Sequence, residues 1–226
     1  MELKKLSELI WYSVFEEERD RPCLGYVRGE NWSLAVDAGH SASHVREFYE
    51  ALTREGLPLP ALTVITHWHW DHAFGMHSIA GLSAANSRTN QHLIGFADRI
   101  RAEGVSGFLD LDPSIRREYA SGEPVVIVPA DIVFEDRLCL DPGGVTVQLS
   151  TCISPHTDDT TLVFVPEEKI LFVGDGISGV FPTWERDPEK TKALIETLRG
   201  FDADHILGGH WDLFEKDELL DALAAG

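Results

Sequence analysis

The chain has 226 residues, of which 43% are hydrophobic and 25% charged, and this is the composition of an ordinary globular protein with enough length for one large domain. Its formal net charge of −19 disfavours nucleic acids and anionic membranes as partners. No apolar run approaches the ~18 residues of a membrane span, and the N-terminus lacks a signal-peptide core, so we expect a cytoplasmic protein.

The first half of the chain is predicted to alternate strands and helices. Three β-rich runs come first, at 9–16, 23–29 and 32–39. The segment 43–55 has apolar residues at spacings of three and four, which predicts a helix that a Gly and a Pro then end. The run 61–66 is rich in β-branched residues and predicts a strand. A short helix is expected to begin at Asp71, and a longer helical segment spans 87–122.

The second half of the chain returns to strands. Five further runs are predicted as strands, at 125–128, 137–141, 144–150, 160–166 and 169–175. A helix at 188–199, a strand at 204–210 and a closing helix at 214–224 complete the chain. Because no linker divides it, we predict a single domain over 1–226, in which two sheets pack face to face with helices outside.

Residues 66–72 read THWHWDH and place three histidines and one aspartate directly after a predicted strand. His67 and His69 are two positions apart, so in an extended backbone both side chains project to the same side and can bind one metal ion. Asp71 and His72 follow where the short helix is expected to begin, so they would point to a second, adjacent ion. Imidazole and carboxylate together are ligands that Zn²⁺ prefers.

Two metal ions need more ligands than one loop supplies, and three residues at predicted strand ends are candidates. His156 lies in SPHTDD between two predicted strands, and Asp175 ends the apolar run ILFVGD. His210 follows ILGG, where two glycines allow a close approach of the backbone. Functional residues collect where strands give way to loops, so we expect these three to complete the site.

The pattern H-x-H-x-D-H, followed by His156, Asp175 in GD and His210 in GGH, resembles the metallo-β-lactamase-fold hydrolases, and VDAG near Asp37 resembles an early strand end of that family. The resemblance implies an α/β fold, the αββα four-layer sandwich of two mixed β-sheets flanked by helices. The family often has Gly where this chain has Pro155, so the loop before His156 must differ. The ligand sets that the resemblance implies are His67, His69 and His156 for one metal, Asp71, His72 and His210 for the second, and Asp175 as a bridge between them.

The resemblance also implies a chemistry. We expect two divalent metal ions, zinc first, with iron or manganese as alternatives. Two ions about 3.5–4 Å apart can share a water molecule and lower its pKa towards ~7. The resulting bridging hydroxide is expected to attack an ester, lactone or thioester carbonyl of a small molecule. Asp71 is the candidate catalytic residue that orients this hydroxide and passes a proton to the leaving group.

Other activities of the family fit the sequence less well. Lactam-cleaving members usually lack Asp at the position of Asp175, and transfer-RNA-processing members need a basic surface. Glyoxalase-II-like thioesterases carry a further helical part, whereas 16 residues follow His210 here. Lactonases of the family share the full ligand set. An iron-dependent oxidoreductase resembling persulfide dioxygenases and a phosphodiesterase are kept as alternatives.

The segment 87–122 has two interpretations. It is either a surface helix pair that packs its own apolar stripe or a helical insertion that caps the active site. Aromatic candidates for the pocket wall are Trp68, Trp70, Tyr119, Phe181 and Trp184. Strand alternation would direct the first two of these away from the metals and into packing. A small-molecule substrate is the expected partner, and the oligomeric state is left open, with a homodimer as one alternative.

Overall fold

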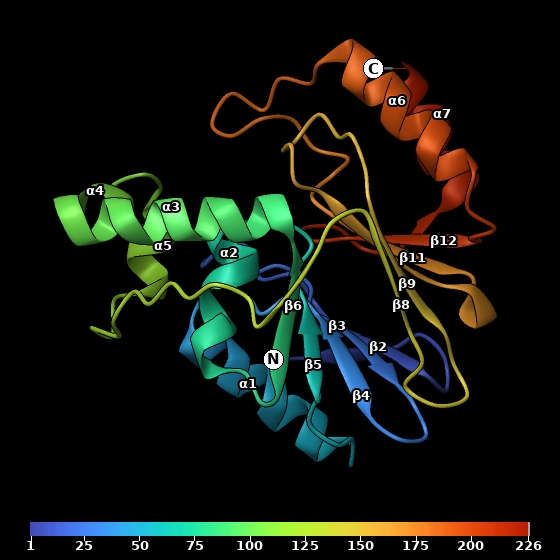
Figure 1. Cartoon of the computed structure of the whole chain (residues 1–226), viewed down its shortest axis with the longest axis horizontal. Coiled ribbons are helices and arrows are strands. Elements are labelled where there is room, and N and C mark those ends of the chain that lie inside the picture. Colours follow the sequence, from blue (N-terminus) through green and yellow to red (C-terminus); the bar gives the residue numbers. More distant parts are fainter. Residues whose placement is uncertain (226) are drawn as a thin grey trace.

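A computed structural model describes residues 1–225 of the chain and places its strands in two sheets that face each other (Figure 1). The first sheet follows chain order from β1 to β7, and the second has the order β13-β12-β11-β10-β9-β8. The strands of the first sheet are β1 (Leu3–Lys5), β2 (Ile10–Ser13), β3 (Gly25–Arg28), β4 (Ser33–Val36), β5 (Leu62–Val64), β6 (Leu82–Asn86) and β7 (Ile132–Phe134). Those of the second are β8 (Arg137–Leu140), β9 (Val147–Thr151), β10 (Thr161–Val165), β11 (Ile170–Gly174), β12 (His205–Gly208) and β13 (Phe214–Glu215).

Helices connect the strands and cover the outer faces of the sheets. They are α1 (Ala42–Arg54), α2 (Trp70–Ala73), α3 (Ser87–Glu103), α4 (Ser106–Leu109), α5 (Pro113–Glu118), α6 (Pro188–Arg199) and α7 (Lys216–Ala225), with 3-10 turns η1 (Phe74–Ser78) and η2 (Pro166–Glu168). Within residues 1–225, no helix combines the length and the apolar character needed to cross a bilayer.

The main core lies between the two sheets. A second core lies under α6 and α7, since strands such as β10 are apolar on both faces. Val163 and Val165 of β10 point towards the first sheet and join the core between the sheets. Leu162 and Phe164 of the same strand point outwards and join a second core under α6 and α7. This alternation follows from the two-residue period of a strand and explains why both faces of the sheet are covered.

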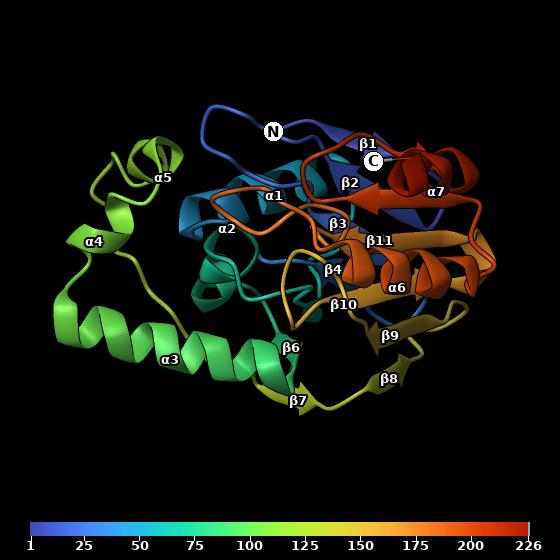
Figure 2. The ribbon, with the colours of Figure 1, turned by 90° about the horizontal axis from the view of Figure 1, so that it is seen from above.

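Helices pack on both outer faces and give the molecule four layers. Phe48 and Leu52 of α1 pack against the outer side of the first sheet. Leu194 of α6 and Leu220 of α7 pack against the outer side of the second. Figure 2 shows α6 and α7 over the second sheet and α3, α4 and α5 on the opposite side of the molecule. The fold is therefore the αββα sandwich of two mixed sheets that the sequence predicts.

The segment 87–122 is helical, as predicted, and forms α3, α4 and α5. Its apolar residues share one core with α2, and Leu93, Phe96, Phe108 and Ile115 are buried there. This packing accounts for the apolar stripe of the segment, and a capping role remains a prediction.

The prediction of a strand at 125–128 is wrong. The chain has no regular structure there, and the seventh strand of the first sheet forms further on, at β7. Pro124 and Pro129 flank the run and lack the N–H that a ladder hydrogen bond requires. Its apolar side chains instead pack under α3 as part of a core that the sequence could not reveal. Strands β1, β6 and β13 were also not predicted, and the closing helix expected at 214–224 begins at Lys216, after β13.

The central strands of both sheets end at one edge of the sandwich. β5 runs parallel to β4 and β6 in the first sheet, and β11 runs parallel to β12 in the second. The backbone N–H of Thr161 donates to the carbonyl of Thr66 at 2.7 Å and joins the two sheets at this edge. The loops after β5, β11 and β12, and the loop between β9 and β10, therefore meet there.

Candidate metal centre

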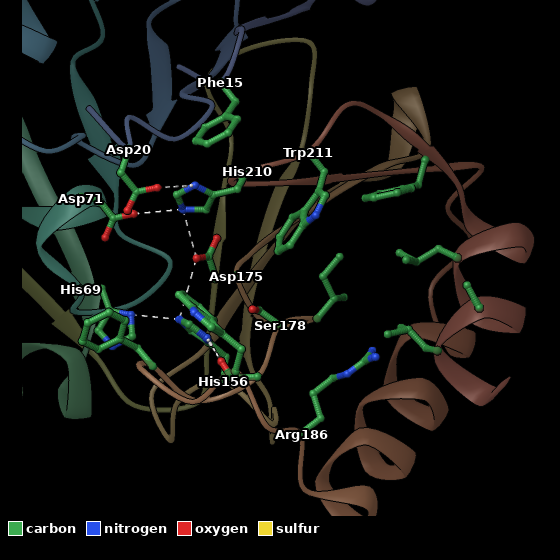
Figure 3. A pocket seen from close by; sticks show the side chains of 18 of the residues that line it. Phe15, Asp20, His69, Asp71, His156, Asp175, Ser178, Arg186, His210 and Trp211 are labelled. Atoms are coloured by element: carbon green, nitrogen blue, oxygen red, sulfur yellow. Dashed lines mark hydrogen bonds and ion pairs between the residues drawn. The ribbon is translucent and has the colours of Figure 1, made fainter. Parts of the chain in front are cut away.

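The structure brings all seven predicted ligands together at this edge, in two clusters of donor atoms. In each cluster the donor atoms lie within 4.8 Å of one another. The first cluster contains His67, His69 and His156, and the second contains Asp71, His72, Asp175 and His210. Both sets contain only imidazole and carboxylate groups. Figure 3 shows His69, Asp71, His156, Asp175 and His210 converging on one space from both sheets.

In the first cluster, hydrogen bonds fix the protonation of two rings. Nδ1 of His67 lies 3.2 Å from the hydroxyl of Thr66, and that hydroxyl gives its own proton to a carboxylate, so it accepts from the ring. Nδ1 of His156 donates to the carbonyl of Gly179 at 2.7 Å. With Nδ1 as the donor, Nε2 of His67 and Nε2 of His156 are the nitrogens that face the cluster. Both lie close to Nδ1 of His69, at 3.1 and 2.9 Å.

The three inner nitrogens of this cluster face one another, and hydrogen bonds cannot pair all of them. Burial lowers the pKa of His67 well below its usual value and that of His69 to about 3, so the rings are neutral at physiological pH. A single proton on His69 can serve only one of its two neighbours. Two nitrogens that each bind zinc at about 2.0–2.1 Å lie roughly 3.3 Å apart in a tetrahedral site, which is close to the distances here. The donor set fits a small divalent cation.

In the second cluster, two carboxylates orient the histidine rings from outside. Oδ2 of Asp37 lies 2.7 Å from Nδ1 of His72, and Oδ1 of Asp20 lies 3.2 Å from Nδ1 of His210. Because an ionised carboxylate only accepts, each Nδ1 carries the proton, and each Nε2 faces the cluster. The sequence did not predict this role for either aspartate. Asp37 follows β4 and Asp20 lies in the loop after β2, so only the fold brings them to the site.

The inner atoms of this cluster are imidazole nitrogens and carboxylate oxygens gathered around one point. Nε2 of His210 lies 3.0 Å from Oδ2 of Asp71 and 3.2 Å from Oδ2 of Asp175. Nε2 of His72 lies 3.3 Å from Oδ2 of Asp71 and 3.4 Å from Oδ1 of Asp175. Nε2 of His72 and Oδ1 of Asp175 are buried and make no hydrogen bond within the described chain. Buried polar atoms without a hydrogen bond lower the stability of the folded chain, unless a cation or a shared proton interacts with them.

The charges of the second cluster favour a bound cation. Burial alone would raise the pKa of Asp71 and Asp175, but the two neighbouring histidines outweigh it and hold the pKa of both carboxyls well below the usual value. Burial opposes charge on His72 and His210 as well, yet the aspartates raise the pKa of both rings well above 6.5. The site thus retains two buried carboxylates that attract positive charge, and a divalent ion can replace the protons on the rings.

Asp175 lies between the two clusters. Its Oδ2 is 3.2 Å from Nε2 of His210 and 3.8 Å from Nε2 of His156. One carboxylate is therefore near donors of both sets, which is the position that the resemblance implies for a bridging ligand. Asp175 is 4% exposed, so it lies between the clusters rather than in solvent.

Glycine allows the second sheet to approach the donors. A Cβ atom on Gly209 would lie 2.5 Å from Oδ1 of Asp175 and 2.6 Å from Cε1 of His72. No side chain fits in that space. The expectation that the glycines before His210 permit a close backbone approach agrees with this geometry. Pro155, where the family often has Gly, leaves the ring of His156 directed into the first cluster.

The clusters open into a cavity of about 610 Å³, which is within the usual range for a small-molecule site. Of the aromatic candidates, Trp70, Phe181 and Trp184 line it. Among the described residues Trp68 packs instead on Phe96, with ring centroids 5.5 Å apart. Tyr119 is buried and its hydroxyl donates to the carbonyl of His40 at 2.7 Å.

Of the described residues in the segment 87–122, one lines this cavity. It is Asp112, the N-cap residue of α5. No arginine of this segment is part of the described lining. The cavity wall opposite the metal donors comes instead from the loop after β11 and from α7.

The sequence matches a family model described as "Metallo-beta-lactamase superfamily" over residues 25–210. No curated protein sequence is significantly similar to the chain. The match includes every predicted metal ligand and, of the described elements, leaves out β1, β2, β13 and α7.

Solved structures share the fold at low sequence identity. A metallo-beta-lactamase from Pontibacter korlensis superimposes with a TM-score of 0.69 at 17% identity, covering 99% of this chain and 97% of that one. The DIM-1 metallo-beta-lactamase gives 0.67 at 18% identity, with coverages of 99% and 95%. The sec-alkylsulfatase Pisa1 from Pseudomonas sp. gives 0.70 at 16% identity, covering 98% of this chain but 40% of that one.

Proposed function

The chain belongs to the metallo-beta-lactamase superfamily, and on that basis we propose that it is a metal-dependent hydrolase that cleaves an ester, lactone or thioester bond of a small molecule. The fold is of the metal-binding, hydrolase type. The narrower proposal, a carbonyl substrate and two divalent ions with zinc first, goes beyond family membership.

One observation carries the proposal: two buried donor clusters meet at Asp175 on the floor of an open cavity. A structural metal site is closed on all sides by protein ligands, whereas a catalytic site keeps a position open to substrate. His69 and His210 are partly exposed, and both line the cavity. A substrate in the cavity would therefore reach both clusters.

The proposed chemistry divides between the cofactor and the chain. Bound divalent ions would supply the Lewis acidity that activates a water molecule and polarises the substrate carbonyl. Asp71 lies at the N-terminal turn of α2, buried beside His210, and lines the cavity. We assign it the transfer of a proton from the attacking water to the leaving group. Asp37 and Asp20 act as positioning residues, since they hold the rings of His72 and His210.

The charge and lining of the cavity support an uncharged or weakly charged substrate. Four aspartates line it, and the whole chain carries a net charge of −19. Polyanions such as nucleic acids would be repelled. Aromatic and aliphatic side chains form much of the rest of the wall. These features favour the acyl compounds over phosphodiesters.

The test is activity profiling of the full chain after removal of metal and reloading with zinc or manganese. We expect hydrolysis of at least one ester, thioester or lactone, with activity lost on metal removal and restored on reloading. A phosphodiester, a β-lactam and a persulfide with oxygen uptake as the readout are the comparison reactions. Metal-dependent turnover of one of these alone, or no bound metal in the purified protein, would overturn the proposal.

A further inference from the structure

The cavity continues past the donor clusters into an arm with a different character. We call this the apolar arm and define it by Ile177, Trp184, Trp211, Leu219, Ala222 and Leu223, all of which line the cavity. They come from three segments: the loop after β11, the loop after β12, and α7. Figure 3 shows the donors on one side of the pocket and the C-terminal helices on the other. The arm is thus continuous with the proposed reaction site.

The loop after β11 holds a large aromatic side chain over the arm. Val180 and Glu185 form an isolated antiparallel bridge, and a Cβ atom on Gly179 would lie 2.1 Å from the carbonyl oxygen of Trp184. This tight turn places Trp184 at φ 59°, a conformation that non-glycine residues rarely adopt. Its side chain is 55% exposed, yet its ring lies parallel to that of His156, with centroids 6.4 Å apart. A strained, exposed tryptophan beside a metal-binding histidine is typical of a ligand-contacting surface.

Helix α7 supplies the aliphatic wall. Leu219, Ala222 and Leu223 are spaced three and four apart, so they share one face of the helix. All three line the cavity, and Leu219 and Leu223 also belong, with Leu220, to the core under the helix. Ala222 is exposed in spite of its apolar neighbours, and its small side chain leaves the arm open.

The arm offers few polar partners. Apart from the metal-donor candidates Asp175 and His210, the described lining from the loop after β11, the loop after β12 and α7 contains one charged side chain, that of Arg186, together with Ser178. A polar substrate group buried there would lose its water without replacing the hydrogen bonds. An aliphatic chain has no such requirement and gains free energy as each methylene leaves water.

We propose that the apolar arm binds an unbranched aliphatic chain attached to the scissile carbonyl, so that the substrates are medium-chain acyl esters, thioesters or lactones. This proposal rests on the proposed hydrolase function and names the substrate class of the same site. The acyl chain lies along α7, with its carbonyl at the donor clusters. The distance between the donors and the end of the arm sets the length of acyl chain that fits.

The experiment is a chain-length series of 4-nitrophenyl esters, from acetate to decanoate, with the zinc-loaded full chain. We expect kcat/KM to rise about fourfold for each added methylene until the arm is full, the equivalent of about 0.8 kcal/mol per methylene. Ala222→Trp should fill the arm from an exposed position and move the optimum to shorter chains. Ala224→Trp is the matched control, because Ala224 is exposed on the same helix and does not line the cavity. It should keep the wild-type optimum.

Other outcomes separate this proposal from the hydrolase proposal. Active protein whose kcat/KM is flat or falls with acyl length would overturn the arm and leave the hydrolase standing. A rise with the length of the alcohol in alkyl acetates, but not with acyl length, would overturn the acyl assignment. If no ester is cleaved, calorimetric binding of decanoate and acetate decides. Decanoate binding at least tenfold tighter than acetate, and lost in Ala222→Trp, supports the arm; equal binding overturns it.

Discussion

Oδ2 of Asp37 lies 2.7 Å from Nδ1 of His72, and both groups are almost fully buried. The same carboxylate accepts from the backbone N–H and the hydroxyl of Thr66, at 2.7 and 2.9 Å. One aspartate therefore fixes a ligand of the second cluster directly and, through Thr66, a ligand of the first. It stands outside both sets of donors and contributes to the position of a ligand in each.

Replacing Asp37 with Ala should weaken metal binding without removing a ligand. The ring of His72 loses the acceptor that fixes its Nδ1 proton, and loss of such an outer partner typically costs 10–100-fold in metal affinity. Calorimetric titration of metal-free protein with zinc measures the affinity and the stoichiometry. Asp131→Ala is a control. Asp131 accepts a hydrogen bond from Ser83 and does not line the cavity that contains the clusters. Equal zinc affinity in Asp37→Ala and wild type would contradict the role.

Asp71→Asn should retain the fold and lose most turnover. The amide has nearly the shape of the carboxylate but cannot carry a proton between water and leaving group, and loss of such proton transfer typically costs 10²–10⁴-fold in kcat. Circular dichroism checks the fold, and kcat is measured at saturating zinc so that weaker metal binding does not mimic the effect. Undiminished kcat in a fully loaded variant would remove the proton-transfer role.

Gly209→Ala tests the close approach of the second sheet. The added methyl would lie 2.5 Å from Oδ1 of Asp175 and 2.6 Å from His72, so one of these ligands must move. We expect zinc affinity and turnover to fall together by at least tenfold. Gly95→Ala is the matched control, because nothing lies within 4 Å of its added methyl and its position within α3 favours Ala by about 1 kcal/mol. A variant at Gly209 with wild-type affinity would show that the neighbours relax freely.

Glu118→Gln should destabilise the protein. Arg21 is 1% exposed, and its guanidinium donates to both carboxylate oxygens of Glu118, at 2.7 and 2.9 Å. Removing one partner of a buried pair leaves the other charge poorly compensated, at a cost of about 3 kcal/mol. Glu47 remains 2.9 Å from Arg21 and limits the loss. Urea denaturation measures it, and Glu103→Gln, on the exposed end of α3, should change the unfolding free energy by less than about 0.5 kcal/mol.

Two buried histidines outside the metal clusters predict a loss of stability in mild acid. Burial lowers the pKa of His40, and burial together with Arg21 lowers that of His44 well below 6.5. The unfolded chain titrates these rings near 6.5, so below that pH it binds protons that the folded chain does not, and the free energy of unfolding falls. Each such proton contributes about 1.4 kcal/mol per pH unit.

The variant His44→Asn isolates this effect. Metal-free wild type and variant are denatured with urea at pH 5.5 and 7.5, and the wild type should lose more stability between the two. One proton taken up over the pH unit below 6.5 corresponds to about 1.4 kcal/mol, and the wild type should lose about this much more unfolding free energy than the variant. Parallel losses in the two proteins would contradict the assignment. The metal ligands are the same in both, so their own titration cancels.

The sequence predicted the layers and the donor set because both are carried by local patterns. Alternating apolar strands predict a sheet whatever its neighbours, and the spacing of His67 and His69 is a property of one short loop. His156, Asp175 and His210 were predicted from their place at strand ends, and parallel strands bring such ends together. The pattern in THWHWDH was specific enough to predict the family.

Other features depend on contacts that no local pattern encodes. The run 125–128 has strong β-propensity, yet its flanking prolines and its packing under α3 leave it without a strand partner. Asp20 and Arg21 are adjacent in sequence, but one orients His210 and the other forms a buried ion pair with α5. Trp184 reaches the pocket only because the turn at Gly179 folds tightly. Long-range neighbours decided each of these positions.

Both sheets contribute donors to the clusters, while the apolar arm is built from segments outside them. Mutations along α7 or in the turn around Trp184 can thus alter which molecules are accepted without touching the reaction machinery. Conversely, loss of one of the four donor side chains in THWHWDH should lower the turnover of every substrate alike. Helix α7 lines the arm and carries none of the seven donors, so in the proposed function this helix is the segment best suited to retargeting.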